Sequence, residues 1–310
     1  MSDQAGEEAA VTTAPGVLRS AWAKWARGVE HQQVLARMSR EWAQAGERNR
    51  YQRCDNATHR DDEVLRMHWH LAEAAPVPER WGVLLGDVLT NLRAALDHAM
   101  WAAVCQLSGP PVQPQVVQFP IVREAARMKG YRKELQLLVA QEVWDLVEAV
   151  QPHHLDDPQR HPLETLRWAS NIDKHRFPHV VRRAYQTVGP ILVRSAGTPL
   201  QVLSEEWNPG HVEVGDVVAA ATLRRPADAR ELDIAITFAH QFELQVGELP
   251  PAWVSLAEVM DAVTDQILAI LGTLAGILGD ELPDVDSLET GAEHAAFAPE
   301  FGGQTIHWNP

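Results

Sequence analysis

One long run of helical periodicity, from about residue 79 to residue 107, constrains this chain more than any other feature. Its apolar residues recur at three- and four-residue spacing and form a stripe wide enough to face a core. Pro76 and Pro78 precede the run, and a proline-rich connection over residues 110–120 follows it. The pattern predicts a long helix whose buried face comprises Leu85, Val88, Leu89, Leu92, Leu96 and Ala99.

Several other segments show the same helical periodicity. We expect a first helix over about residues 16–45 and a long amphipathic helix over residues 252–279. Shorter helices are expected near residues 123–130, 133–151 and 162–175. The last of these must end before Pro178, because proline lacks the amide hydrogen and clashes with a continuing helix.

Two segments alternate apolar and polar residues, which is the pattern of a strand buried on one face. The first is residues 64–71, and residues 49–54 are expected to pair with it. The second is the stretch 180–244, which is rich in valine and isoleucine. These patterns predict a short β-hairpin and a separate, small antiparallel sheet.

The predicted fold class is α+β, a mainly helical bundle with a small antiparallel β-sheet elaboration. A chain of 310 residues exceeds the size at which a single core stops growing. We expect five parts: a disordered N-terminus over 1–15, a helical region over 16–176 with the short β-hairpin near 49–71, a small antiparallel β region over 177–250, a C-terminal helix over 251–280 packing on the helical region, and a loose acidic tail over 281–310.

The charge of the chain limits its partners. A formal net charge of −15 opposes non-specific coating of DNA or of an anionic membrane, because the long-range force on phosphate is repulsive. The basic clusters at 127–133 and 174–183 are interpreted as solvated faces or local patches. The stretch 266–279 is apolar but has only fourteen residues, too few to cross a bilayer, so we expect no membrane contact.

The two cysteines, Cys54 and Cys105, have no Cys-x-x-Cys spacing, which excludes a disulfide scaffold and a cysteine-rich zinc site. The N-terminal residues include Asp3, Glu7 and Glu8 and lack a basic region followed by an apolar run, so no signal peptide is expected. Both observations favour a cytoplasmic protein in a reducing compartment.

The long helix also carries a polar stripe. Asp87, Asn91 and His98 fall within about 40° of one another on a helix that turns about 100° per residue. Arg93 and Asp97 lie beside this stripe at the i, i+4 spacing of an intrahelical ion pair. In the structural interpretation, Arg93 and Asp97 form this ion pair, and His98 bonds Asn91 or a neighbouring helix.

A catalytic interpretation of the same helix begins with Arg93 and His98. An arginine can hold a phosphate, and a histidine that titrates near neutrality can move a proton to or from a ribose or leaving oxygen. The two residues diverge by about 140° on a straight helix, so one helix alone makes a poor site. We therefore expect a homodimer in which a second copy completes the cleft.

The most polar helix end of the chain spans residues 166–176. Arg167, Asn171, Lys174 and His175 share one face of it and are expected to bind substrate together with Asp87 and Asn91 from the long helix. The alternative is a capping role, because the helix dipole favours cations in the last turn.

Histidines elsewhere suggest metal chemistry more weakly. His68 and His70 share one face of a predicted strand and can ligate zinc if a third ligand arrives from elsewhere, with His59 and Asp61 the nearest candidates. A loop carries a second group, which is interpreted as solvated and comprises His153, His154, His161, Asp156 and Asp157. We expect no metal and no cofactor.

The Arg-x-x-x-x-His element, Arg93 to His98, resembles the signature of the HEPN superfamily. This resemblance implies an all-helical domain of a kind that often acts as a dimeric, metal-independent ribonuclease, as in many toxins and defence proteins. Only Arg93 and His98 are carried over. Ala94 departs from the family pattern, in which a polar residue usually follows the arginine.

The chain also resembles a group of uncharacterised bacterial proteins through three segments, Asn91–His98, Phe119–Ile121 and Asn171–Arg176. That group implies no activity. The HEPN resemblance implies cleavage of RNA with His98 as general acid or base and Arg93 as phosphate clamp. The alternative is a non-catalytic dimeric module that binds a nucleotide, a small anion or a protein partner.

Overall fold

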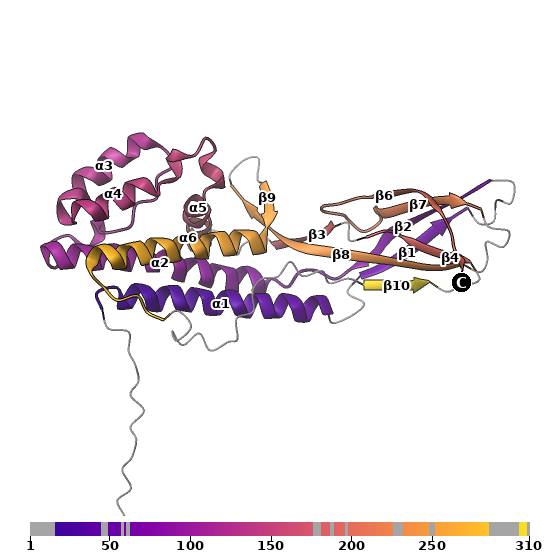
Figure 1. Cartoon of the computed structure of the whole chain (residues 1–310), viewed down its shortest axis with the longest axis horizontal. Coiled ribbons are helices and arrows are strands. Elements are labelled where there is room, and N and C mark those ends of the chain that lie inside the picture. Colours follow the sequence, from indigo (N-terminus) through magenta and orange to yellow (C-terminus); the bar gives the residue numbers. More distant parts are fainter. Residues whose placement is uncertain are drawn as a thin grey trace, which may run out of the picture. The chain divides into compact units, whose positions relative to one another are not determined.

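The computed structural model describes residues 16–44, 49–56, 59, 63–175, 181–186, 189–195, 198–225, 232–247, 252–284 and 304–308. These residues contain six α-helices and ten β-strands, drawn in Figure 1. They separate into two compact units, each assembled from three stretches of chain. We call residues 1–30, 89–167 and 263–291 the helical unit, and residues 31–88, 168–262 and 292–310 the β unit.

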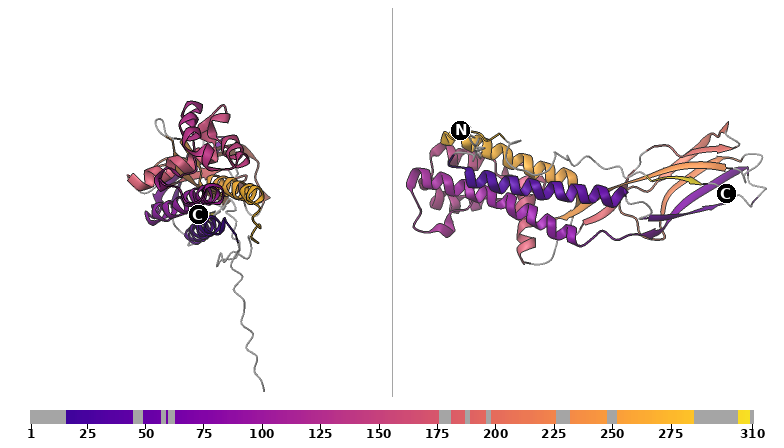
Figure 2. Two further views of the ribbon diagram at one scale, coloured as in Figure 1. Left: turned by 90° about the vertical axis from the view of Figure 1, so that its left-hand side faces the viewer. Right: turned by 90° about the horizontal axis from the view of Figure 1, so that it is seen from below.

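Three long helices run through these units: α1 (Arg19–Gln44), α2 (Arg80–Ser108) and α6 (Leu256–Leu278). The segments of these helices that belong to the helical unit lie side by side in Figure 2. Within the helical unit, the Trp25 indole nitrogen donates to the Thr264 carbonyl of α6 at 3.3 Å. Gly28 permits α1 to approach α2 closely, since a Cβ there would lie 2.7 Å from Cδ2 of Leu92.

The apolar face predicted for α2 is confirmed. All six predicted residues of this face, Leu85, Val88, Leu89, Leu92, Leu96 and Ala99, have 0% exposure. The helix itself spans Arg80–Ser108, within one residue of the expected range at each end. The helical periodicity of the sequence is therefore enough to identify the face of α2 that is buried.

The shorter helices of the chain are α3 (Ala125–Leu135), α4 (Gln141–Ala149) and α5 (Pro162–His175). The connection that leads to them from α2 is buried at Val117, Phe119, Ile121 and Val122. The amide of Gln151, which is itself buried, holds this connection by accepting from the Val122 backbone at 2.8 Å and donating to the Pro120 carbonyl at 3.0 Å. The connection is therefore a fixed part of the helical unit.

The β unit contains a four-stranded antiparallel sheet in the order β1-β2-β7-β6. Its strands are β1 (Asn49–Asp55), β2 (Val64–Ala74), β6 (Val202–Trp207) and β7 (Val217–Arg224). The long strand β8 (Leu232–Val246) pairs antiparallel with the remaining partners. These are β3 (Val181–Gln186), β4 (Leu192–Ser195), β9 (Ala252–Ser255) and β10 (Gln304–Trp308), and β5 (Thr198–Pro199) pairs with β4.

One hydrophobic cluster joins the two layers of strands in the β unit. From β2 it takes every second residue, Leu65, Met67, Trp69 and Leu71, and from β8 it takes Ile234, Ile236 and Phe238. Tyr51 of β1 stacks on Phe238 with ring centroids 4.0 Å apart. The two-residue period predicted for 64–71 is thus confirmed, and it places the alternate residues of β2 on the opposite face of the sheet.

The prediction of a mainly helical bundle with a small sheet is wrong. The described residues contain ten strands in antiparallel sheets, and the hairpin expected to decorate a helical region is half of a four-stranded sheet. The reason is pairing at long range: β2 pairs with β7, so that Val64 lies opposite Arg224. Alternation reveals a strand but not its partner, and the expected contiguous regions differ from the interleaved units that form.

Helix α6 is longer than the fourteen-residue apolar stretch identified in the sequence. Its 23 residues include a window with a mean hydropathy of 1.4, long and apolar enough to cross a membrane by length and composition alone. The argument from insufficient length therefore does not hold. Core helices of globular proteins have the same composition, and α6 buries Val263, Ile267, Leu271 and Leu274.

Candidate functional site

Arg93, the first residue of the Arg-x-x-x-x-His element, is held in three hydrogen bonds. Its Nε donates to Asp97 Oδ2 at 3.2 Å, and its Nη2 donates to Asp97 Oδ1 at 2.8 Å and to the Phe119 carbonyl at 2.7 Å. The Phe119 amide in turn donates to Asp97 Oδ1 at 2.9 Å. Both backbone polar groups of Phe119 are therefore satisfied by one ion pair on α2.

This arrangement gives the Arg93–Asp97 pair a structural role. Phe119 is fully buried, and a buried backbone group without a partner costs free energy, so the pair fixes the path of the returning connection. The arginine side chain is 14% exposed. The pair thereby links Asn91–His98 to Phe119–Ile121, two segments identified separately in the sequence.

His98 contacts α1. Its Nδ1 lies 2.6 Å from the hydroxyl oxygen of Ser20, and one turn further along α1 the Lys24 ammonium donates to the amide oxygen of Asn91 at 3.3 Å. Asn91 and His98, which the helical spacing placed on one stripe, therefore both bond to α1. His98 has a partner on a neighbouring helix, as its structural interpretation supposed.

His98 also lines an open pocket of about 800 Å³ between α1, α2 and the connection that follows α2. The walls are largely apolar, and the indole of Trp101 in this wall is 38% exposed. No lysine or arginine is among the described residues that line the pocket, which are Val17, Ser20, Asp97, His98, Trp101, Ala102, Cys105, Gln106 and Val117.

The structure does not bring Arg93 and His98 together in this pocket. His98 lines it and Arg93 does not, which follows from the angle of about 140° between positions five apart on a helix. The second subunit that the catalytic interpretation requires remains a prediction.

The other predicted binding residues that the structure describes are not among those lining the pocket. Arg167 forms two hydrogen bonds with the buried Glu164 on its own helix, at 2.7 and 2.6 Å. Asp87 and Asn171 are exposed. The side chains of Lys174 and His175 lie outside the described residues. Among those described, Asp87, Asn91, Arg167 and Asn171 do not line the pocket.

The histidines of the loop before α5 contact the backbone. Nδ1 of His161 accepts a hydrogen bond from the Leu163 amide at 3.1 Å, so this neutral ring caps the first turn of α5. Burial lowers the pKa of His161, which favours the neutral form that such an acceptor needs. His153 and His154 contact the carbonyls of Val122 and Glu148 at 3.3 and 2.9 Å.

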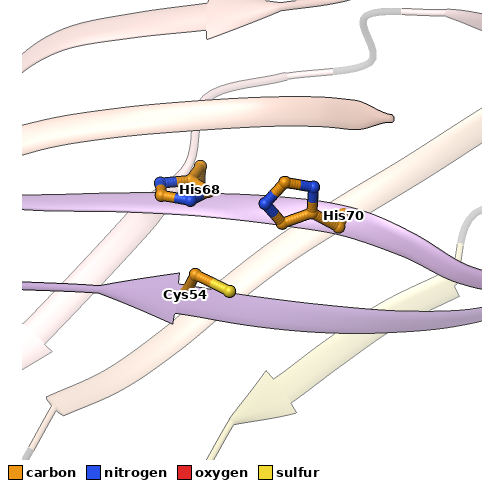
Figure 3. A group of neighbouring side chains, drawn as sticks. All are labelled: Cys54, His68 and His70. Atoms are coloured by element: carbon orange, nitrogen blue, oxygen red, sulfur yellow. The ribbon is translucent and has the colours of Figure 1, made fainter. Parts of the chain in front are cut away.

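A second cluster lies in the β unit, where Cys54 joins His68 and His70. One possible ligand atom from each of the three residues lies within 4.8 Å of the others, and Figure 3 shows the side chains on one face of β1 and β2. The sequence singled out His59 and Asp61 as the third ligand and missed Cys54. Asp61 lies outside the described residues, and the signal that identifies Cys54 is the hairpin register, which places it opposite His68.

Comparisons of the chain with protein-family models, with curated proteins and with solved structures found no match. The HEPN resemblance accordingly remains a prediction carried by Arg93 and His98.

Proposed function

We propose that the pocket between α1 and α2 binds a small, largely apolar ligand that carries one polar group. The observation that carries this proposal is His98 in the wall of an open pocket beside the exposed indole of Trp101. A volume of about 800 Å³ fits small molecules, whose sites are mostly apolar clefts with a few placed polar groups.

The chemistry of the wall narrows the ligand class. Trp101 offers an aromatic face for stacking, while the His98–Ser20 pair offers one donor and one acceptor at a fixed place. The described wall contains no lysine or arginine to neutralise a bare anion. The neutral heteroaromatic part of a nucleotide therefore fits this wall better than a phosphate does.

Binding of adenosine, guanosine and indole, measured by calorimetry, tests this proposal, with inorganic phosphate as the anionic comparison. Trp101→Ala and His98→Ala should each weaken binding of a heteroaromatic probe at least tenfold. Leu107→Ala, an exposed position on the same helix outside the pocket, should leave it unchanged. The proposal fails if none of the three aromatic probes binds, or if both pocket variants bind like the original protein.

Metal-independent cleavage of RNA is a second candidate function for the same pocket. The observation that favours it is the orientation of His98: the Ser20 hydroxyl contacts Nδ1, so the other ring nitrogen remains to move a proton as a general acid or base. Because Arg93 is engaged by Asp97 and Phe119, the phosphate clamp would have to come from another cation, for example on a second copy of the chain.

The ribonuclease candidate is tested on single-stranded RNA in the presence of EDTA. We expect products ending in a 2′,3′-cyclic phosphate, and we expect His98→Ala but not Leu107→Ala to abolish cleavage. Equal cleavage by the His98→Ala variant, or intact RNA with the unmodified protein, contradicts catalysis by His98.

A further inference from the structure

We propose that Cys54, His68 and His70 form a transition-metal site in the β unit, best suited to Zn²⁺, with three protein ligands and one exchangeable position. This site is separate from the pocket and independent of the function proposed for it. Figure 3 shows the three side chains projecting from adjacent strands β1 and β2.

The hairpin brings the three ligands together. Cys54 lies directly opposite His68 in the antiparallel register, and His70 is two residues further along β2, on the same face. Their ligand atoms lie within 4.8 Å of one another. Tetrahedral zinc with bonds of about 2.0–2.3 Å needs donor atoms roughly 3.5 Å apart, so small side-chain rotations complete the geometry.

A second observation points to the same ligand set. Nδ1 of His70 lies 2.8 Å from the carbonyl oxygen of Gly215. Only a protonated nitrogen can donate to a carbonyl, so this contact places the ring proton on Nδ1 and leaves the lone pair of Nε2 for a metal. Metal-binding histidines commonly donate their other ring nitrogen to a carbonyl or carboxylate in this way.

The Gly215 carbonyl is itself fixed in place. Gly215 has a φ of +104°, which suits glycine, and its amide donates to the Leu71 carbonyl of β2 at 2.8 Å. The Leu71 amide donates to the Asp216 carbonyl at 3.0 Å. The turn that orients His70 is therefore bonded to the strand that carries His70.

The opposite face of β2 holds the strand rigidly. Leu65, Met67, Trp69 and Leu71 are buried in the hydrophobic cluster of the β unit, while His68 and His70 are half-buried. The next strand places Ala220, whose side chain is a single methyl group, opposite His68. The ligands thus start from a fixed backbone and remain accessible to an ion.

One thiolate and two imidazoles are a ligand set that zinc accepts readily. When Zn²⁺ binds, the Cys54 thiol loses its proton to solvent as the zinc–sulfur bond forms. Each neutral histidine contributes one nitrogen lone pair and releases no proton. No oxidant or reductant takes part in this step.

The placement of the ligands argues for a reactive rather than a structural metal. All three ligands belong to one hairpin that backbone hydrogen bonds and a buried face already hold together, so an ion links no distant segments. Closed structural zinc sites have four protein ligands, whereas catalytic sites have three and keep one position for water or substrate. We therefore assign the fourth position to an exchangeable ligand.

Titration of the untagged, reduced protein with Co²⁺, followed by displacement with Zn²⁺, tests the site. We expect one equivalent to bind with a thiolate-to-cobalt charge-transfer band. Cys54→Ser should remove that band, and His68→Ala or His70→Ala should weaken binding at least tenfold. Cys105→Ser changes the other cysteine of the chain and should bind as the original does. Circular dichroism without metal confirms that each variant is folded.

The proposed site is wrong if the folded original protein binds neither Co²⁺ nor Zn²⁺. It is equally wrong if Cys54→Ser retains the charge-transfer band, or if Cys105→Ser loses it. The exchangeable position has its own test: azide or imidazole added to the cobalt-loaded protein should change the visible spectrum. An unchanged spectrum would contradict the proposal that the fourth coordination position is exchangeable.

Discussion

The helical unit and the β unit use their polar residues in different ways. On α2, Arg93 and Asp97 hydrogen-bond to the backbone of Phe119, and of the two ends of the Arg-x-x-x-x-His element only His98 lines the pocket. On the β1–β2 hairpin, Cys54, His68 and His70 project from one half-buried face and lie together. A helix disperses residues five apart around its axis, whereas paired strands bring cross-strand neighbours together.

The largest expected effect is a loss of stability when the Arg93–Asp97 pair is broken. Arg93→Ala leaves the Phe119 carbonyl and the Asp97 carboxylate without their charged partner, so the free energy of unfolding should fall by about 2–4 kcal/mol. Urea denaturation measures it. Arg27→Ala, which breaks an exposed ion pair with Glu30, is the matched control and should change stability by less than about 1 kcal/mol. Equal stability of the two variants would contradict the structural role of Arg93 and favour its catalytic interpretation.

Zinc should stabilise the β unit. A ligand that binds only the folded state at about 100 times its Kd raises the free energy of unfolding by about 2.7 kcal/mol. In urea denaturation with zinc, the free energy of unfolding of the original protein and of Cys105→Ser should rise by this amount, and that of Cys54→Ser should not change. An equal increase in the free energy of unfolding of Cys54→Ser would show that zinc binds elsewhere. The proposed difference between the two units would then be wrong.

The cap on α5 predicts a pH dependence. The pKa of His161 is lowered below its ordinary value of 6.5, so the unfolded chain binds the proton first as the pH falls. Stability from this group is complete above about pH 6.5 and is lost as the pH falls toward the folded-state pKa. His161→Asn keeps a capping acceptor without the titration.

The measurement for His161 is the difference in the free energy of unfolding between the two proteins across this pH range, obtained by urea denaturation. The expected difference is about 1 kcal/mol or less, the size of one cap. Parallel curves for His161→Asn and the original protein would contradict the capping role.

The smallest expected effect concerns Ser20. Ser20→Ala removes the hydroxyl beside His98 at an exposed position, so the free energy of unfolding should fall by less than about 1 kcal/mol. Affinity for a heteroaromatic probe should fall more, because the ring of His98 loses the group that orients it. An unchanged affinity would show that His98 binds without help from α1.

Particular residues show how much of the fold and of the candidate sites could be predicted from the sequence. The buried face of α2 and the alternation in β2 were predicted because local periodicity determines them. The pairing of β2 with β7, which made the sheet far larger than expected, depends on contacts between residues remote in the sequence. The same limit hid Cys54, since no fixed sequence spacing relates a cysteine to the histidines on the returning strand.

The sequence by itself determined the long helices, the strands with one buried face and the separation of Arg93 from His98 around α2. These follow from the 3.6- and two-residue periods of the backbone. Only the tertiary structure decided that Arg93 clamps Phe119, that His98 lines a pocket against α1, and that Cys54 meets His68 and His70. Each of these depends on which segments pack together, a choice made by burial and backbone pairing across the whole chain.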